Sequence, residues 1–187
     1  MPGMNSIVWN QVAGWGVALL VALWAGWLDW RFRRIPNWLT VSGFVLGLVS
    51  NGFLSGWIGI KAGLEGAGIA IAVLIVPVIL RGIGAGDLKL MIALGACLGP
   101  WKFLNLLLAS IFIAGFMAIV EIVRKRRVKQ TLGNLVVLIR AFATFGMGAR
   151  ESIVTLDDPG TLSLPFGVAI ALAMVLVVFT KSSLLTF

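Results

Sequence analysis

The chain has 187 residues, of which 60% are hydrophobic and only 12% are charged, whereas soluble domains are about half apolar and about a quarter charged. This composition excludes an ordinary soluble domain and predicts one integral membrane domain over residues 1–187, and the net charge of +8 is typical of basic cytoplasmic loops rather than of nucleic-acid binding. The absence of His and the single Cys, Cys97, exclude Ser-His and Cys-His nucleophilic sites and His or multi-Cys zinc sites, so we expect no metal.

Six apolar runs predict an all-α bundle of six transmembrane helices. They cover Ile7–Leu28, Trp38–Ile58, Ala62–Leu80, Leu88–Trp101, Phe103–Val123 and Leu164–Thr180. A spanning helix needs about 20 apolar residues, and the fourth run is shorter. We therefore expect its first turn, which carries Asp87, to start below the membrane surface, where irregular backbone is tolerated only beside protein or a watery cavity.

The basic residues give the orientation of this bundle. With the N-terminus outside, all of the 15 Lys and Arg residues except Lys61, Lys102 and Lys181 fall on one side. The excess of positive charge makes that side cytoplasmic. It includes a polar loop of about residues 124–163, whose Arg-Lys-Arg-Arg run is expected to attract anionic lipid.

Asp29 ends the first apolar run, in the segment Asp-Trp-Arg-Phe-Arg-Arg-Ile-Pro-Asn. Placing an ionisable group near lipid costs free energy, so such a group predicts a functional site by default. One interpretation is structural: Asp29 pairs with Arg33, and Pro36 and Asn37 form a turn in which Asn37 caps the second helix. The other is functional: the turn pins Asp29 in position while the arginines hold the loop at the headgroups. Taken alone, the segment fits both.

Asp87 opens the fourth run, in Gly-Ala-Gly-Asp-Leu-Lys. The structural interpretation is a helix N-cap. The functional one is that Gly84 and Gly86 let an extended substrate backbone approach closely, while the helix N-terminus favours a carboxylate. If Asp29 lay beside it, the two carboxyl groups would share one proton, as in aspartic proteases. Phosphate binding is disfavoured, because an acid directly follows the glycines and no Lys-Ser or Lys-Thr is present.

Together these motifs resemble the type IV prepilin peptidases, polytopic membrane aspartic proteases of the Gly-x-Gly-Asp class. The matching residues are Asp29, Arg31, Arg34, Ile35, Pro36, Asn37, Gly84, Gly86, Asp87 and Lys89. The segment from Leu164 to Ile170 is similar to the Pro-(Tyr/Phe)-Gly-x-Ala opening of that family's last helix. The chain is most similar to the short CpaA/TadV-like members, which serve Flp-type (tight adherence) pili, because it lacks the four-Cys cytoplasmic insertion of longer relatives.

The resemblance implies a function and assigns residues to it. Asp29 and Asp87 would be catalytic, and the protein would cleave the leader of a type IV (Flp-type) prepilin after a Gly, at the cytoplasmic face of a bacterial inner membrane. The residues that would bind substrate or position the loop are Gly84, Gly86, Lys89, Arg31, Arg34, Pro36 and Asn37. We expect no cofactor and no N-methyltransferase activity. The expected partners are the prepilin leader with its apolar helix, a bilayer with anionic lipids, and pilus assembly or secretion components, but no nucleic acid.

Two alternatives belong to other functional classes. An ion-coupled transporter component would carry acids deep within several spans, whereas the acids here gather at one face. A non-enzymatic subunit of a pilus assembly or secretion complex would explain the bundle and the basic loop, but it would not explain the two aspartate motifs.

Overall fold

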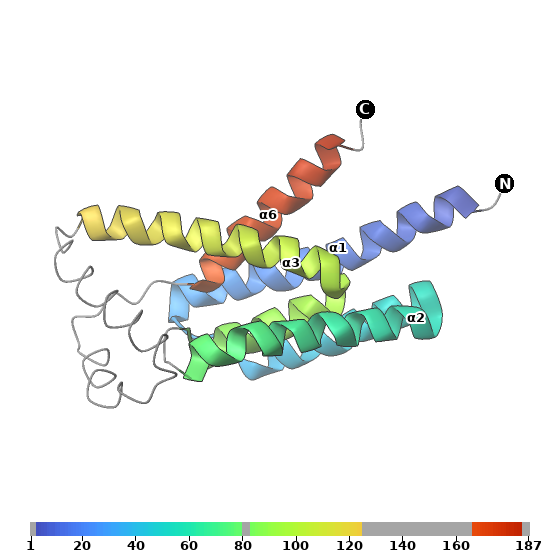
Figure 1. Ribbon diagram of the computed structural model, residues 1–187, viewed down its shortest axis with the longest axis horizontal. Helices are drawn as coiled ribbons and strands as arrows, with labels where there is room; N and C mark the ends of the chain where they lie inside the picture. The colour runs from blue at the N-terminus through green and yellow to red at the C-terminus, as the bar shows by residue number, and fades with distance from the viewer. Residues whose placement is uncertain (1–2, 80–82, 125–165, 185–187) are drawn as a thin grey trace.

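The computed structural model describes the backbone of residues 3–79, 83–124 and 166–184 and, within them, the side chains of residues 15–79, 83–124 and 166–180. Every element in these ranges is an α-helix (Figure 1). The helices are α1 (Gly3–Phe32), α2 (Asn37–Ile79), α3 (Ala85–Arg124) and α6 (Phe166–Leu184). The predicted all-α class is confirmed for this part of the chain, while the predicted loop beyond Arg124 lies outside it.

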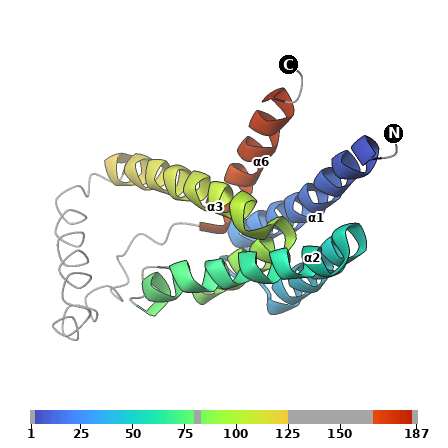
Figure 2. The same ribbon diagram turned by 45° about the vertical axis from the view of Figure 1, so that its right-hand side comes forward.

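The two longest elements, α2 and α3, each consist of two helical segments joined at a glycine. Gly56 has φ 59° and ψ −143°, and Gly99 has φ 72° and ψ 178°. Side chains with a Cβ rarely adopt such positive φ values, and both elements double back at these bends (Figures 1 and 2). The apolar runs predict these breaks slightly later in the chain, after Ile58 and at Lys102. They fall earlier because glycine, rather than lysine, supplies the conformation that the turn needs.

By length and composition, α2 and α3 are the described helices that can cross a membrane, while the apolar stretch Phe166–Thr180 of α6 is shorter. The predicted apolar runs from Trp38 to Ile58 and from Ala62 onward are the two segments of α2. Those from Leu88 and from Phe103 onward are the two segments of α3. The described helices therefore support an apolar helical bundle, and the six-span arrangement remains a prediction.

The first segment of α3 forms the centre of the bundle. Leu90, Met91 and Leu94 are fully buried, as expected for a helix that is apolar on all sides. Small residues let its neighbours approach: a Cβ on Gly95 would lie 2.5 Å from the Gly66 carbonyl oxygen, and a Cβ on Gly47 would lie 2.7 Å from Cys97 Sγ. These glycines therefore let the helices of the bundle pack closely against each other.

A stripe of small residues on α1 ends at Asp29. Ala18, Ala22 and Ala25 are fully buried, and Asp29 is 8% exposed. Spacings of four, three and four residues place all of these side chains on one helix face, so the face that packs inward also carries Asp29 inward. The same end of α1 crosses the start of α6, where a Cβ on Gly26 would lie only 2.6 Å from the Ala171 Cβ (Figure 2).

Candidate active site

One cavity of about 310 Å³ lies where the ends of three helices meet. It is lined by Asp29, Arg33, Arg34, Ile35, Asn37, Gly84, Gly86, Asp87 and Lys89. All of these residues belong to the two segments singled out from the sequence, which are far apart along the chain. The structure therefore brings both aspartates to one cavity, and it adds three cationic side chains to the walls.

Asp29 is anchored by the N-terminus of α6. The Gly167 N–H donates a hydrogen bond of 2.9 Å to Asp29 Oδ2, and the Val168 N–H also donates to this carboxylate. The first N–H groups of a helix have no partner within it and attract negative charge. Two such donors satisfy one side of Asp29 and fix the carboxylate, while the rest of the group faces the cavity.

The turn after α1 returns the chain sharply toward the cavity. Arg33 has φ 52°, in the left-handed region, and its N–H donates to the Asp29 carbonyl oxygen at 2.9 Å. This hydrogen bond closes the helix as an αL cap does. The Leu39 N–H then donates to the Pro36 carbonyl oxygen at 3.2 Å as α2 begins. Asp29 and Asn37 are thus placed on the same cavity although the turn between them is short.

Asp87 lies in the first turn of α3 and not at its N-cap, which corrects the structural interpretation given above. The helix begins at Ala85, and the Asp87 and Leu88 N–H groups donate to the Gly84 carbonyl oxygen at 3.1 and 3.2 Å. The Asp87 carboxylate in turn accepts a hydrogen bond from the Gly84 N–H. Gly84 is therefore the cap, and Asp87 is the acid that reaches back to it, as in a capping box.

The two carboxyl groups are close enough to interact electrostatically. Two neighbouring carboxylates disfavour each other's ionisation, so their proximity favours a pair that holds one proton. Such a pair combines a proton acceptor and a proton donor in one cavity, which is the chemical requirement for hydrolysis without a covalent intermediate.

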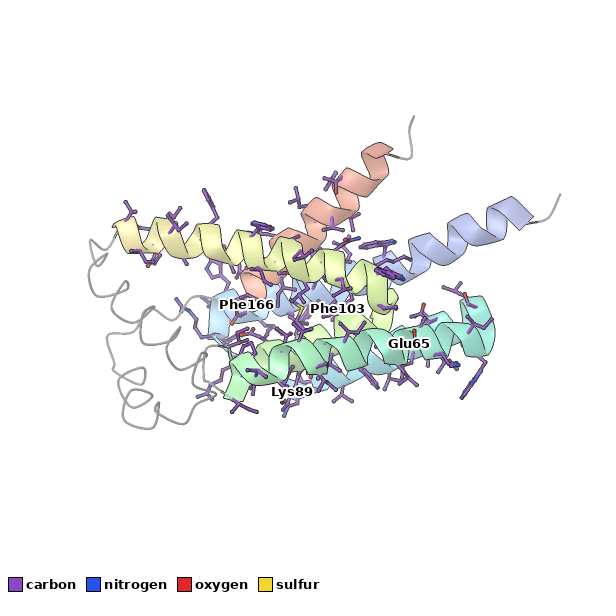
Figure 3. All side chains as sticks on the ribbon, viewed as in Figure 1. Glu65, Lys89, Phe103 and Phe166 are labelled. Atoms are coloured by element: carbon purple, nitrogen blue, oxygen red, sulfur yellow. The ribbon has the colours of Figure 1, made fainter. Side chains whose placement is uncertain are left out.

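Lys89 and Asn37 join the two halves of the cavity. Lys89 Nζ donates a hydrogen bond of 2.9 Å to Asn37 Oδ1, so the side chain of Asn37 links the start of α2 to the first turn of α3. Figure 3 shows Lys89 and Phe166 toward one end of the bundle and Glu65 toward the other. The hydrogen bond helps to set the distance between the segments that carry the aspartates.

The two glycines of the second segment differ in their surroundings. A Cβ on Gly84 would lie 3.2 Å from Asp87 Oδ2, which is a tight contact, whereas a Cβ on Gly86 would lie 3.6 Å from the Ile35 Cβ, which is an ordinary one. Gly84 therefore gives the Asp87 carboxylate room to fold back. At Gly86, packing does not require a glycine, so the missing side chain leaves space on the cavity wall.

The other candidate residues are divided between the cavity and its surroundings. Arg34 lines the cavity, whereas Arg31 and Pro36 are not among the lining residues. Arg33, Ile35 and Gly167 also contact the site. The sequence indicates Arg33 only as a structural partner of Asp29, and it indicates no role for Ile35 or Gly167. Arg33 and Ile35 lie within the first motif, and Gly167 lies in the segment that is similar to the opening of the family's last helix. Their position within these motifs is the sequence feature that could have indicated a role at the site.

Among the residues that the structure describes, no group of three or more acidic, Cys or His side chains could hold a metal ion. The cavity thus offers two carboxyl groups, three cations and backbone donors as its chemical groups. Cys97 is buried, and its thiol contacts the Gly43 carbonyl oxygen within the bundle.

Comparison with known proteins gives one result. A family model described as the type IV leader peptidase family matches residues 16–119. This range contains Asp29 and Asp87 and ends before α6. A search of curated proteins finds no match, and a search of solved structures finds none either.

Proposed function

Because this chain belongs to the type IV leader peptidase family, we propose that it is a membrane aspartic endopeptidase in which Asp29 and Asp87 are the catalytic pair. The family implies a prepilin leader peptidase. The observation that carries the assignment of residues is that both aspartates line one cavity, although they come from different helices.

The proposed reaction is the direct attack of water on the scissile carbonyl. The ionised aspartate accepts a proton from the water while the water oxygen bonds to the carbonyl carbon. The protonated aspartate donates a hydrogen bond to the carbonyl oxygen and its proton passes to the leaving nitrogen as the C–N bond breaks. One water is consumed, and the products are a new carboxylate on the leader and a new amino terminus on the pilin.

The proposed substrate is the leader of a Flp-type prepilin, cut after a Gly that precedes an apolar helix. A glycine at the scissile bond lets an extended backbone reach the aspartates, and the open wall at Gly86 provides the matching space. The apolar helix of the substrate would enter from the bilayer and pack against the bundle. The absence of a four-Cys insertion is the reason to propose leader cleavage without N-methylation.

The proposed topology is a single six-span domain over residues 1–187 in a bacterial inner membrane. Arg33, Arg34 and Lys89 line the cavity, while Lys61 lies shortly after the Gly56 bend and Lys102 shortly after the Gly99 bend. This distribution of positive charge supports a cavity that opens toward the cytoplasm. Basic residues on that side would also attract anionic lipid.

The proposal is tested by co-expressing the protein with an epitope-tagged Flp-type prepilin and by measuring leader removal on a gel. Asp29→Ala and Asp87→Ala should each abolish cleavage at an unchanged membrane level, and Asp29→Asn and Asp87→Asn should do the same because they retain shape and lose the titrating group. Glu65→Ala removes an exposed carboxylate from the other end of the bundle (Figure 3) and serves as the matched control.

The same assay separates the alternatives. Purified protein that cleaves a synthetic prepilin peptide in detergent would exclude a purely structural assembly subunit and a transporter. Full cleavage by either Asp→Asn variant would remove that aspartate from catalysis. Loss of cleavage in Glu65→Ala to the same extent would mean that the assay reports folding and not chemistry.

A further inference from the structure

Arg33 adopts a backbone conformation that favours glycine. Its φ of 52° makes it the one residue other than glycine with a positive φ among the described residues. The position follows the last helical residue of α1, where the chain commonly uses a glycine because a Cβ clashes in the left-handed region. An arginine at this position therefore costs conformational energy that a glycine would not.

The location of the side chain offers a reason for retaining it. Arg33 lines the cavity together with Asp29 and Asp87, and its guanidinium interacts electrostatically with the Asp29 carboxylate. Strained backbone persists where the surrounding structure or the function requires the residue. Arg31, on the last turn of α1, and Arg33 are both exposed, but of the two only Arg33 lines the cavity beside Asp29.

We propose that Arg33 is a positioning residue for Asp29, whose guanidinium offsets the repulsion between the two carboxyl groups and fixes the orientation of the Asp29 carboxylate opposite the Gly167 N–H. This inference rests on the proposed function. The other charged groups at the cavity are Asp87 and Lys89 from α3 and Arg34 from the turn. Lys89 donates to Asn37, and among the described residues α6 contributes backbone N–H groups.

The experiment measures kcat and KM for a synthetic prepilin peptide with the purified full-length protein. Arg33→Gly should give at least the wild-type yield of folded protein, because glycine suits this backbone, while kcat falls about tenfold to a hundredfold, the range expected for a misplaced catalytic group. KM should stay within about twofold, since an interaction with the enzyme's own carboxylate is not a substrate contact. Arg33→Lys should recover part of kcat, because it keeps the positive charge but not the planar guanidinium.

The controls distinguish this inference from the proposed function itself. Lys61→Ala removes an exposed cation elsewhere on α2 and should leave both constants unchanged. If the wild-type protein cleaves and Arg33→Gly retains its full kcat, or loses activity only through KM, the positioning role is overturned while the peptidase assignment stands. If Arg33→Lys is no better than Arg33→Gly, charge is not what Arg33 contributes. A wild-type protein that cleaves nothing would instead overturn the proposed function.

Discussion

The Gly167 N–H and Asp29 Oδ2 are joined by a hydrogen bond of 2.9 Å, across 138 residues of chain. The bond connects the first turn of α6 to the last turn of α1, and it lies beside the close contact between Gly26 and Ala171. The crossing of these two helices therefore fixes the position of the first aspartate. The last helix, which lies outside the range matched by the family model, is part of the site.

Gly167→Ala should impair both catalysis and stability. A Cβ there would lie 2.8 Å from Asp29 Oδ2 and 2.9 Å from the Asp29 Cβ, so the carboxylate and the crossing of α1 and α6 would both have to shift. We expect kcat of the folded protein to fall about tenfold to a hundredfold, together with a lower melting temperature in detergent. Gly68→Ala is the matched control, because nothing lies within 4 Å of its Cβ position. Equal kcat values for the two variants would contradict a role of α6 in placing Asp29.

The two cavity segments could be predicted from the sequence because each is short and local. Pro36 restricts the backbone conformation of the turn after α1, and Gly84 caps the helix that carries Asp87. Each segment therefore positions its own aspartate. Neither the contribution of Gly167 nor the left-handed backbone of Arg33 could be predicted in this way, although the four-residue spacing indicates that Arg33 pairs with Asp29. The contribution of Gly167 depends on a crossing of two helices distant in sequence, and no glycine marks the left-handed turn at Arg33.

The helix breaks illustrate a different limit of sequence reasoning. Apolar runs indicate where helices lie, but lysines at their edges suggested breaks after Ile58 and at Lys102. The backbone turns instead at Gly56 and Gly99, because positive φ is a steric requirement and the charge that follows is tolerated within the next helix. Glycine, which can adopt a positive φ, therefore marks these helix breaks better than the nearby lysines do.

Asn51 should stabilise the bend of α3. Its side-chain amide donates to the Ala96 carbonyl oxygen at 2.8 Å and to the Cys97 carbonyl oxygen at 3.1 Å. The Ala96 carbonyl would otherwise lack a helical donor, because residue 100 is proline. Asn51→Leu should therefore lower the free energy of unfolding by about 1–3 kcal/mol, measured as a lower melting temperature in detergent. Ser50→Ala is the control, because the Ser50 hydroxyl donates a hydrogen bond within its own helix. An equal loss of stability in both variants would show that Asn51 is not the critical donor.

Lys89 and Asn37 should act as a coupled pair. Their hydrogen bond of 2.9 Å is exposed, so its energy is expected to be below about 1 kcal/mol. Lys89→Met and Asn37→Leu should each reduce kcat/KM up to about fivefold, and the double variant should be no worse than the poorer single variant. The measurement is a double-mutant cycle on peptide cleavage. Fully additive losses would mean that the two residues act independently, for example by separate contacts with substrate.

The stability of the bundle should depend on the close contact between Gly66 and Gly95. A Cβ on Gly95 would lie 2.5 Å from the Gly66 carbonyl oxygen and 3.0 Å from the Ala67 nitrogen, both backbone atoms that cannot rotate away. Gly95→Ala must therefore separate α2 from the buried first segment of α3, and we expect a loss of about 1–3 kcal/mol, measured by thermal unfolding in detergent.

Gly115→Ala is the matched control, since it lies in the same helix with nothing within 4 Å of its Cβ position. It should leave the melting temperature unchanged or raise it slightly, through the higher helix propensity of alanine. Asp87 precedes Gly95 on the first segment of α3, and Gly95→Ala should therefore also lower kcat by shifting Asp87 relative to Asn37. A Gly95→Ala protein as stable as wild type would contradict the tight packing of these helices.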